Sequence, residues 1–148
     1  MTAPTTTPVT GGQLATFRLD GDLYGVEVEH VQEVLKSQGL TRVPLAPTAV
    51  AGLINLRGQV VTAIELRERL GRPPRPEGTD AVVIVVRLHG EAVSMLVDSI
   101  ADVVDVDASD FEAPPDTLDG VGRDLIRGAY KLSGQLLLAL DVNRAVGT

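Results

Sequence analysis

The stretch Phe17-Arg18-Leu19-Asp20-Gly21-Asp22-Leu23-Tyr24 predicts a β-hairpin. Residues 13–20 alternate apolar and polar side chains, which is the pattern of a half-buried strand. Gly21 can take the positive φ that a tight turn needs. Residues 23–28 then read as the returning strand.

This hairpin belongs to a pattern that occurs twice. Residues 17–35 align with residues 86–104 at an offset of 69, so that Gly21 corresponds to Gly90. Residues 52–71 align with residues 128–147 at an offset of 76, so that Gly58 corresponds to Gly134. The change of offset predicts a longer loop in the second copy, and the acidic stretch 106–124 supplies it. A repeat of this kind indicates one supersecondary unit used twice.

The remaining elements are short. Residues 51–55 and 59–64 are expected to form two strands around Leu56-Arg57-Gly58, and residues 65–70 a short helix ended by Gly71. Residues 29–35 place apolar side chains at helical spacing, which favours one or two helical turns. Residues 72–80 contain three prolines and a glycine, so they are the best candidate for a linker.

Together these patterns predict a mainly β protein with short helices. Short strands at close spacing favour two small barrels or sandwiches over parallel α/β units. The first lobe spans about residues 13–75 and the second about residues 76–148, with an exchange of strands between them left open. Residues 1–12 are expected to form a disordered tail. Each lobe would be only marginally stable alone, so the lobes should share an interface.

Composition excludes several classes of function. The chain has no cysteine, which rules out disulfides, thiol chemistry and cysteine-based metal sites and suits a reducing compartment. Its net charge is −7, with the excess in the second half, which disfavours nucleic acid and anionic membrane surfaces. We expect no signal peptide, because the N-terminal residues lack a basic and an apolar region. No apolar run is long enough to predict a membrane helix.

No set of residues predicts catalysis. His30 and His89 could serve as general bases, but no nucleophile accompanies either, and a structural role is favoured for both. Gly120-Val121-Gly122 lacks the frame of a phosphate loop. The acidic run from Asp105 has Asp110 where a calcium loop needs glycine. We therefore predict no catalytic residue, no cofactor and no metal, and interpret the acidic run as a solvated loop.

The repeat separates what the fold needs from what a function needs. Arg57 lies in Asn55-Leu56-Arg57-Gly58, and its counterpart in the second copy is Ser133. Because serine suffices at this turn, the fold does not demand arginine there. Arginine is enriched at interface hot spots, so Arg57 is a candidate contact with a partner. The competing interpretation is a surface arginine paired with a local carboxylate.

Five segments in register resemble the CheW family. They are Asp20-Gly21-Asp22-Leu23-Tyr24-Gly25-Val26-Glu27-Val28, Val31-Gln32-Glu33-Val34, Leu40-Thr41-Arg42-Val43-Pro44, Gly52-Leu53-Ile54-Asn55-Leu56-Arg57-Gly58 and Glu65-Leu66-Arg67. The resemblance spans about residues 13–145. Two positions depart from the family pattern, since Thr62 stands where proline is usual and Glu65 where aspartate is usual. Neither touches the Asn-Leu-Arg-Gly turn, which is the most diagnostic segment.

The resemblance implies two intertwined five-stranded, SH3-like barrels with an apolar groove between them. It implies a non-catalytic adaptor in the cytoplasm, recruited to membrane-associated arrays by its partners. Those partners are the regulatory domain of a CheA-type histidine kinase and the cytoplasmic hairpin tip of chemoreceptors, without nucleic acid or direct membrane insertion. By position, the resemblance assigns receptor or array contacts to Val31, Glu33, Gly52, Asn55 and Arg57. It assigns kinase contacts to the segment Leu40, Thr41, Arg42 and Val43.

Two alternatives stay open on the sequence. The same adaptor could serve a non-flagellar pathway that controls pili or gene expression. A protein of another class, a small metal-dependent enzyme, would use the acidic loop with His30 or His89.

Overall fold

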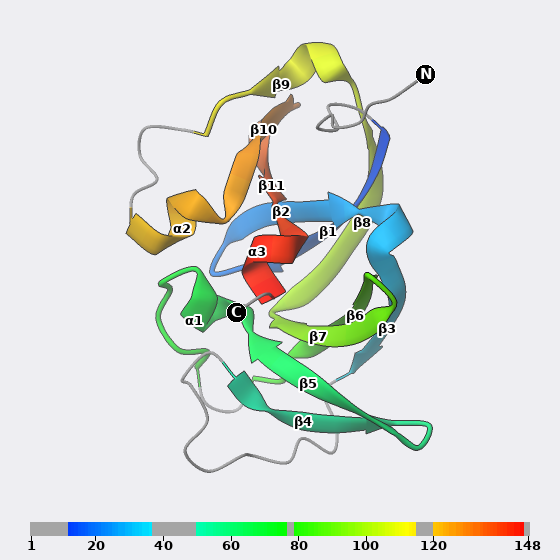
Figure 1. Ribbon diagram of the computed structural model, residues 1–148. Coiled ribbons are helices and arrows are strands. Elements are labelled where there is room, and N and C mark those ends of the chain that lie inside the picture. Colours follow the sequence, from blue (N-terminus) through cyan, green and yellow to red (C-terminus); the bar gives the residue numbers. More distant parts are fainter. Residues whose placement is uncertain (1–11, 37–49, 77–78, 115–119, 147–148) are drawn as a thin grey trace.

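Strands dominate the structure, which is a computed structural model (Figure 1). The structure describes residues 12–36, 50–76, 79–114 and 120–146. The strands are β1 (Gly12–Leu19), β2 (Asp22–Glu27), β3 (Val31–Lys36), β4 (Val50–Leu56), β5 (Gln59–Glu65), β6 (Val82–Leu88), β7 (Glu91–Val97), β8 (Ser99–Val106), β9 (Phe111–Glu112), β10 (Ile126–Leu132) and β11 (Gln135–Leu140). The helices are short: η1 (Val28–His30), α1 (Leu66–Arg69), η2 (Ala108–Asp110), α2 (Gly120–Asp124) and α3 (Val142–Val146). The mainly β prediction is confirmed.

Two sheets are built from these strands, and each contains strands from both halves of the chain. The five-stranded sheet has the order β3-β6-β7-β5-β4, and the six-stranded sheet has the order β8-β1-β2-β11-β10-β9. Figure 1 shows the blue β2 beside β11 from the end of the chain, whereas the green β5 lies beside β7. The sheets are intertwined, as predicted, and the sixth strand is the two-residue β9.

The repeat holds at the level of strand register. Each strand from β1 to β5 has a repeat counterpart: β6, β7, β8, β10 and β11, in that order. Exchanging counterparts turns the order of the five-stranded sheet into that of the six-stranded sheet without β9. The parallel pairing of Ala63 with Ser94 corresponds to that of Ala139 with Gly25. The two copies therefore form the same pairings by exchanging their central hairpins.

The helix predicted at residues 29–35 is only partly present. Residues 28–30 form the single turn η1, and the chain then continues as the edge strand β3. β3 alternates half-buried and exposed side chains and pairs with β6 from Val31 to Lys36. Two β-branched valines suit this strand, and pairing with β6 overrides the helical spacing.

The core has three parts, which reflect the two-sheet architecture. The largest cluster joins both sheets and includes Phe17, Tyr24, Ile84 and Met95, together with residues of α1 and α3. A second cluster belongs to the five-stranded sheet and a third to the six-stranded sheet. The sheets therefore share an apolar interface, as the small size of each lobe required.

Two local predictions can be compared with the structure. Glu65 caps α1, with its carboxylate accepting a hydrogen bond from the Arg67 amide, and Gly71 follows the helix with φ of 72°. Residues 1–11 of the expected tail lie outside the described residues, and Gly12 begins β1.

Candidate functional site

The β4–β5 hairpin ends in a two-residue turn formed by Arg57 and Gly58. Both residues have positive φ, 51° and 88°, which is the signature of a type I′ turn. The Asn55 side-chain oxygen accepts a hydrogen bond of 2.9 Å from the Gly58 amide. Asn55 therefore fixes the turn that presents Arg57.

Arg57 forms a two-pronged ion pair with Glu33, so the carboxylate pairing expected by the competing interpretation is present. Its two terminal nitrogens each donate a hydrogen bond of 2.7 Å to a different oxygen of the Glu33 carboxylate. This hydrogen bonding lowers the pKa of Glu33, against the weaker opposing effect of burial. β3 and β4 are the two edges of the five-stranded sheet, so the pair connects its opposite edges. The Arg57 side chain stays 75% exposed, whereas that of Glu33 is 17% exposed.

The other predicted receptor-contact residues lie farther along the same strands. Val31 begins β3 and packs against the central core, two residues before Glu33. Gly52 is buried in β4, next to a register irregularity between β4 and β5. The structure thus brings Asn55, Arg57 and Glu33 together, while Gly52 shapes the strand behind them.

The second half carries a related but different surface. Val34, which follows Glu33 on β3, and Val60, which lies three residues after Arg57, are exposed large apolar residues, and their repeat counterparts Val103 and Leu136 are exposed as well. The counterpart of Glu33 is Asp102, but Arg57 is replaced by Ser133. Within the described ranges, only the first half therefore combines exposed apolar residues with an arginine–carboxylate pair at a hairpin tip.

The predicted kinase-contact segment Leu40, Thr41, Arg42 and Val43 lies outside the described residues.

Sequence reasoning missed a cluster of ionic residues where the two sheets meet. This arginine cluster consists of three arginines and four carboxylates: Arg67, Arg72, Arg75, Asp20, Asp22, Glu65 and Asp98. Arg67 donates to Asp98 at 2.6 Å and 3.0 Å and is only 6% exposed. Arg75 donates to both Asp98 and Glu65, at 3.0 Å and 2.8 Å.

Asp98 is the centre of this cluster. It follows the end of β7 and precedes β8, so it stands where the chain passes from one sheet to the other. Burial by itself raises the pKa of Asp98, but hydrogen bonds from Arg67, the Asp20 amide and Arg75 outweigh it and lower the pKa to about 2. Asp98 therefore stays ionised over the physiological pH range and ties the β1–β2 turn to α1.

The segment predicted as a linker contributes to the same cluster. Arg72 pairs with Asp20 and Asp22 and donates a hydrogen bond of 2.9 Å to the Tyr24 hydroxyl. Arg75 lies three residues farther along. Proline content correctly indicated irregular backbone here, but it gave no sign that the arginines anchor the segment.

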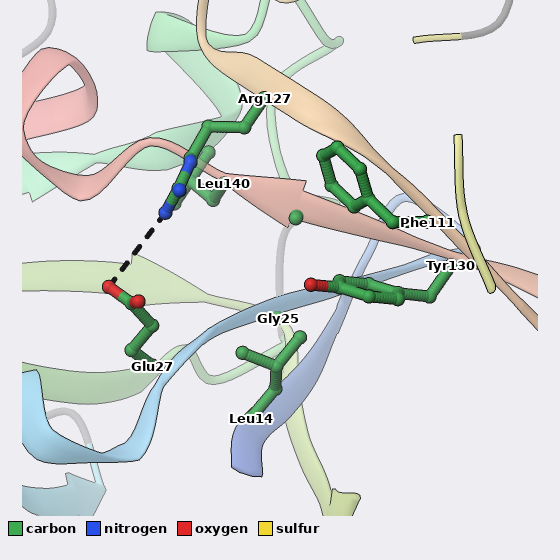
Figure 2. A pocket seen from close by; sticks show the side chains of 8 residues that line it. Leu14, Gly25, Glu27, Phe111, Arg127, Tyr130 and Leu140 are labelled. Atoms are coloured by element: carbon green, nitrogen blue, oxygen red, sulfur yellow. Dashed lines mark ion pairs between the residues drawn. The ribbon is translucent and has the colours of Figure 1, made fainter. Parts of the chain in front are cut away.

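A small pocket lies in the six-stranded sheet, with polar groups on one side and aromatic rings on the other (Figure 2). Arg127 lies 3.8 Å from a Glu27 oxygen, and the rings of Phe111 and Tyr130 are 5.1 Å apart. Glu27 also contacts His30, whose Nε2 is 3.1 Å from the same oxygen. His89, in contrast, occupies the β6–β7 turn with φ of 51°.

No nucleophile accompanies either histidine among the contacts of the described residues. Ser94 is fully buried, and its hydroxyl has no hydrogen-bond partner in the part of the chain that the structure describes. Its position inside the core puts it out of reach of a substrate.

Comparison with known proteins decides the family. Residues 13–147 match the CheW-like domain family. A Treponema pallidum (strain Nichols) protein named Chemotaxis protein CheW is 30% identical over 136 residues, covering 89% of this chain and 80% of that protein. The chain belongs to the CheW family. A CheW protein of Bacillus subtilis (strain 168) is 33% identical over 137 residues, covering 90% of this chain and 86% of its own.

A solved CheW structure supports the same assignment. The crystal structure of scaffolding protein TtCheW from Thermoanaerobacter tengcongensis matches with a TM-score of 0.82 and 25% identity, covering 99% of this chain and 94% of that one. CheW-family membership makes the chain a non-catalytic chemotaxis scaffold. Within the described ranges, no helix is both long and apolar enough to span a bilayer.

Proposed function

We propose that this CheW-family chain is a cytoplasmic adaptor that couples chemoreceptors to a CheA-type histidine kinase. The observation that carries the proposal is the Arg57–Glu33 pair on the β4–β5 hairpin. It is an exposed arginine, held by a carboxylate on the opposite sheet edge, at a position where the second repeat needs only serine.

The geometry suits a contact with a helical partner. Arg57 is oriented by two hydrogen bonds and yet remains 75% exposed, so it can contact a partner with little further loss of side-chain freedom. Val34 and Val60, which are 43% and 61% exposed, add apolar area on the same sheet. Arginine and apolar anchor residues are typical of surfaces that bind a helix in a groove. We assign this surface to the receptor hairpin tip.

The rest of the molecule supplies what an adaptor needs besides one surface. The two sheets share a core and are tied together by the arginine cluster, so surfaces on each sheet keep a fixed relative orientation. We assign the kinase contact to the segment that contains Leu40, Thr41, Arg42 and Val43. Contacts of this kind are individually weak, and an array strengthens them through multivalency.

Co-sedimentation tests the proposal directly. Receptor cytoplasmic fragments are displayed on vesicles, and the kinase is added with or without the full chain. We expect the kinase to sediment with the vesicles only when the chain is present. Kinase recruitment that does not depend on the chain, or a chain that binds neither partner, would refute the adaptor role.

A further inference from the structure

Three potential metal ligands lie together where β2 ends and η1 begins. Glu27 is the last residue of β2, and Glu29 and His30 belong to η1. One donor atom from each lies within 4.8 Å of the donor atoms of the other two. His30 Nε2 and Glu27 Oε1 are 3.1 Å apart. Ligands bound at about 2.0–2.1 Å in a tetrahedral zinc site are separated by about 3.3 Å, so this pair already has nearly the required spacing.

The surroundings of these ligands suit a cation. The His30 and Glu27 side chains are 28% and 23% exposed and Glu29 is exposed, so an ion can reach all three. Imidazole nitrogen and carboxylate oxygen atoms are common ligands of first-row divalent metal ions. The set is also free of competition from thiols, because the chain has no cysteine.

The repeat shows what the corresponding carboxylate does in the other half. Glu29 stands at the repeat position of Asp98, whose carboxylate is bound by Arg67 and Arg75. The counterpart of Arg67 is Asn143, which carries no charge. Asp98 is therefore paired with arginines, whereas Glu29, at the equivalent position, lacks the arginine equivalent to Arg67.

Arg127 approaches the same group of ligands but is too far from Glu27 to form a hydrogen bond. Its terminal nitrogen lies 3.8 Å from Glu27 Oε1, which is longer than a hydrogen bond. Figure 2 shows Glu27 and Arg127 facing each other across the edge of the pocket. Arg127 would compete with a metal ion for Glu27, because its positive charge opposes the approach of a second cation.

We propose that Glu27, Glu29 and His30 form a binding site for a divalent transition-metal cation, with Zn²⁺ as the probe. The ion would tie the end of β2 to η1, directly before the strand that carries Val31 and Glu33. This proposal concerns a separate set of ligands and does not depend on the partner assignments made above.

Calorimetric titration of the tag-free full chain with ZnCl₂ tests the site. We expect one Zn²⁺ per chain, and a loss of affinity of at least about tenfold in both His30→Ala and Glu29→Gln. His89→Ala is the matched control, because it removes the chain's other histidine, and it should bind like the wild type. Arg127→Gln should bind more tightly, since it removes a competing positive charge.

A second readout separates binding from folding. Zn²⁺ should raise the melting temperature of the wild type and of His89→Ala but not that of His30→Ala, whose far-UV spectrum without zinc should remain native. The proposal is overturned if the wild type shows no saturable binding. It is equally overturned if His30→Ala and His89→Ala lose affinity alike, or if Arg127→Gln weakens binding.

Discussion

The β4–β5 hairpin and the β10–β11 hairpin occupy repeat-related positions but have different turns. Gly58 and Gly134 take nearly the same φ, 88° and 82°. Arg57 adopts a left-handed φ of 51°, whereas Ser133 is not among the residues with positive φ. A left-handed conformation is unfavourable for a residue with a side chain such as arginine. The two turns therefore differ in backbone conformation at the residue before the glycine.

This difference indicates that Arg57 serves something other than folding. The second hairpin pairs its strands in the same way without an arginine, and Asp102 still stands at the counterpart position of Glu33. Positive φ alone does not set Arg57 apart, because Asp20 and His89 have φ of 53° and 51° at the β1–β2 and β6–β7 turns. The pairing of the two strands is common to both halves, and the arginine–carboxylate pair is specific to the first.

A second comparison concerns the junctions between the sheets. At one junction Asp98 is bound by two arginines, and at the other its counterpart Glu29 lies beside His30 and Glu27. We expect the first junction to contribute to stability and the second to contribute little until a cation is bound. The predictions that follow test these differences between the halves.

The largest expected effect comes from removing the centre of the arginine cluster. Asp98→Ala should reduce the free energy of unfolding by roughly 3 kcal/mol, because it leaves the buried Arg67 without its main partner. The counterpart change Glu29→Ala, measured in EDTA, should alter it by no more than about 0.5 kcal/mol. Urea denaturation of both variants makes the comparison, and equal losses would contradict the assigned roles.

A smaller effect should appear on acidification. The pKa of Asp98 is about 2 in the folded chain, below the ordinary value of 3.8, so its ionised form stabilises the fold. That contribution is complete above the ordinary value and is lost as the pH falls from about 4 towards 2. Unfolding free energies measured from pH 5 to pH 2 should therefore fall less steeply for Asp98→Asn than for the wild type. Parallel curves would show that Asp98 is not the group responsible.

The smallest effects should come from another pair of repeat counterparts, Ser94 and Gly25. Ser94→Ala should stabilise the chain by about 1 kcal/mol, because it removes a buried hydroxyl that lacks a hydrogen-bond partner among the described residues. Gly25→Ala should destabilise it by about 1 kcal/mol, because a Cβ there would lie 3.1–3.3 Å from Leu137 and Leu14. Thermal unfolding measures both, and shifts of the same sign would contradict this account of the packing.

The sequence was most informative where structure is local. Turns at Gly21, Gly58 and Gly90 could be predicted because positive φ favours glycine, and all three have it. The β3 strand could not, because Val31, Val34 and Leu35 happen to have helical spacing and the strand depends on distant β6. Pairing between strands that are far apart in the sequence cannot be predicted from a short stretch of residues.

The candidate site was predictable in part for the same reason. Arg57 could be singled out because the repeat offers Ser133 for comparison, but its partner Glu33 is twenty-four residues away and meets it only through the curvature of the sheet. The arginine cluster joins residues from four separate segments, and the repeat alignment gave no signal for it. The His30 cluster was likewise hidden, because acids beside a histidine usually form a solvated surface.

The most direct test of the central claim exchanges the residues at the two hairpin tips. Affinity for a receptor hairpin fragment is measured by calorimetry for the full-length wild type, Arg57→Ser and Ser133→Arg. The asymmetry predicts that Arg57→Ser weakens binding by roughly 30-fold while the chain stays folded, and that Ser133→Arg binds like the wild type. Wild-type affinity in a folded Arg57→Ser variant would contradict the claim that the first hairpin is the receptor-binding surface.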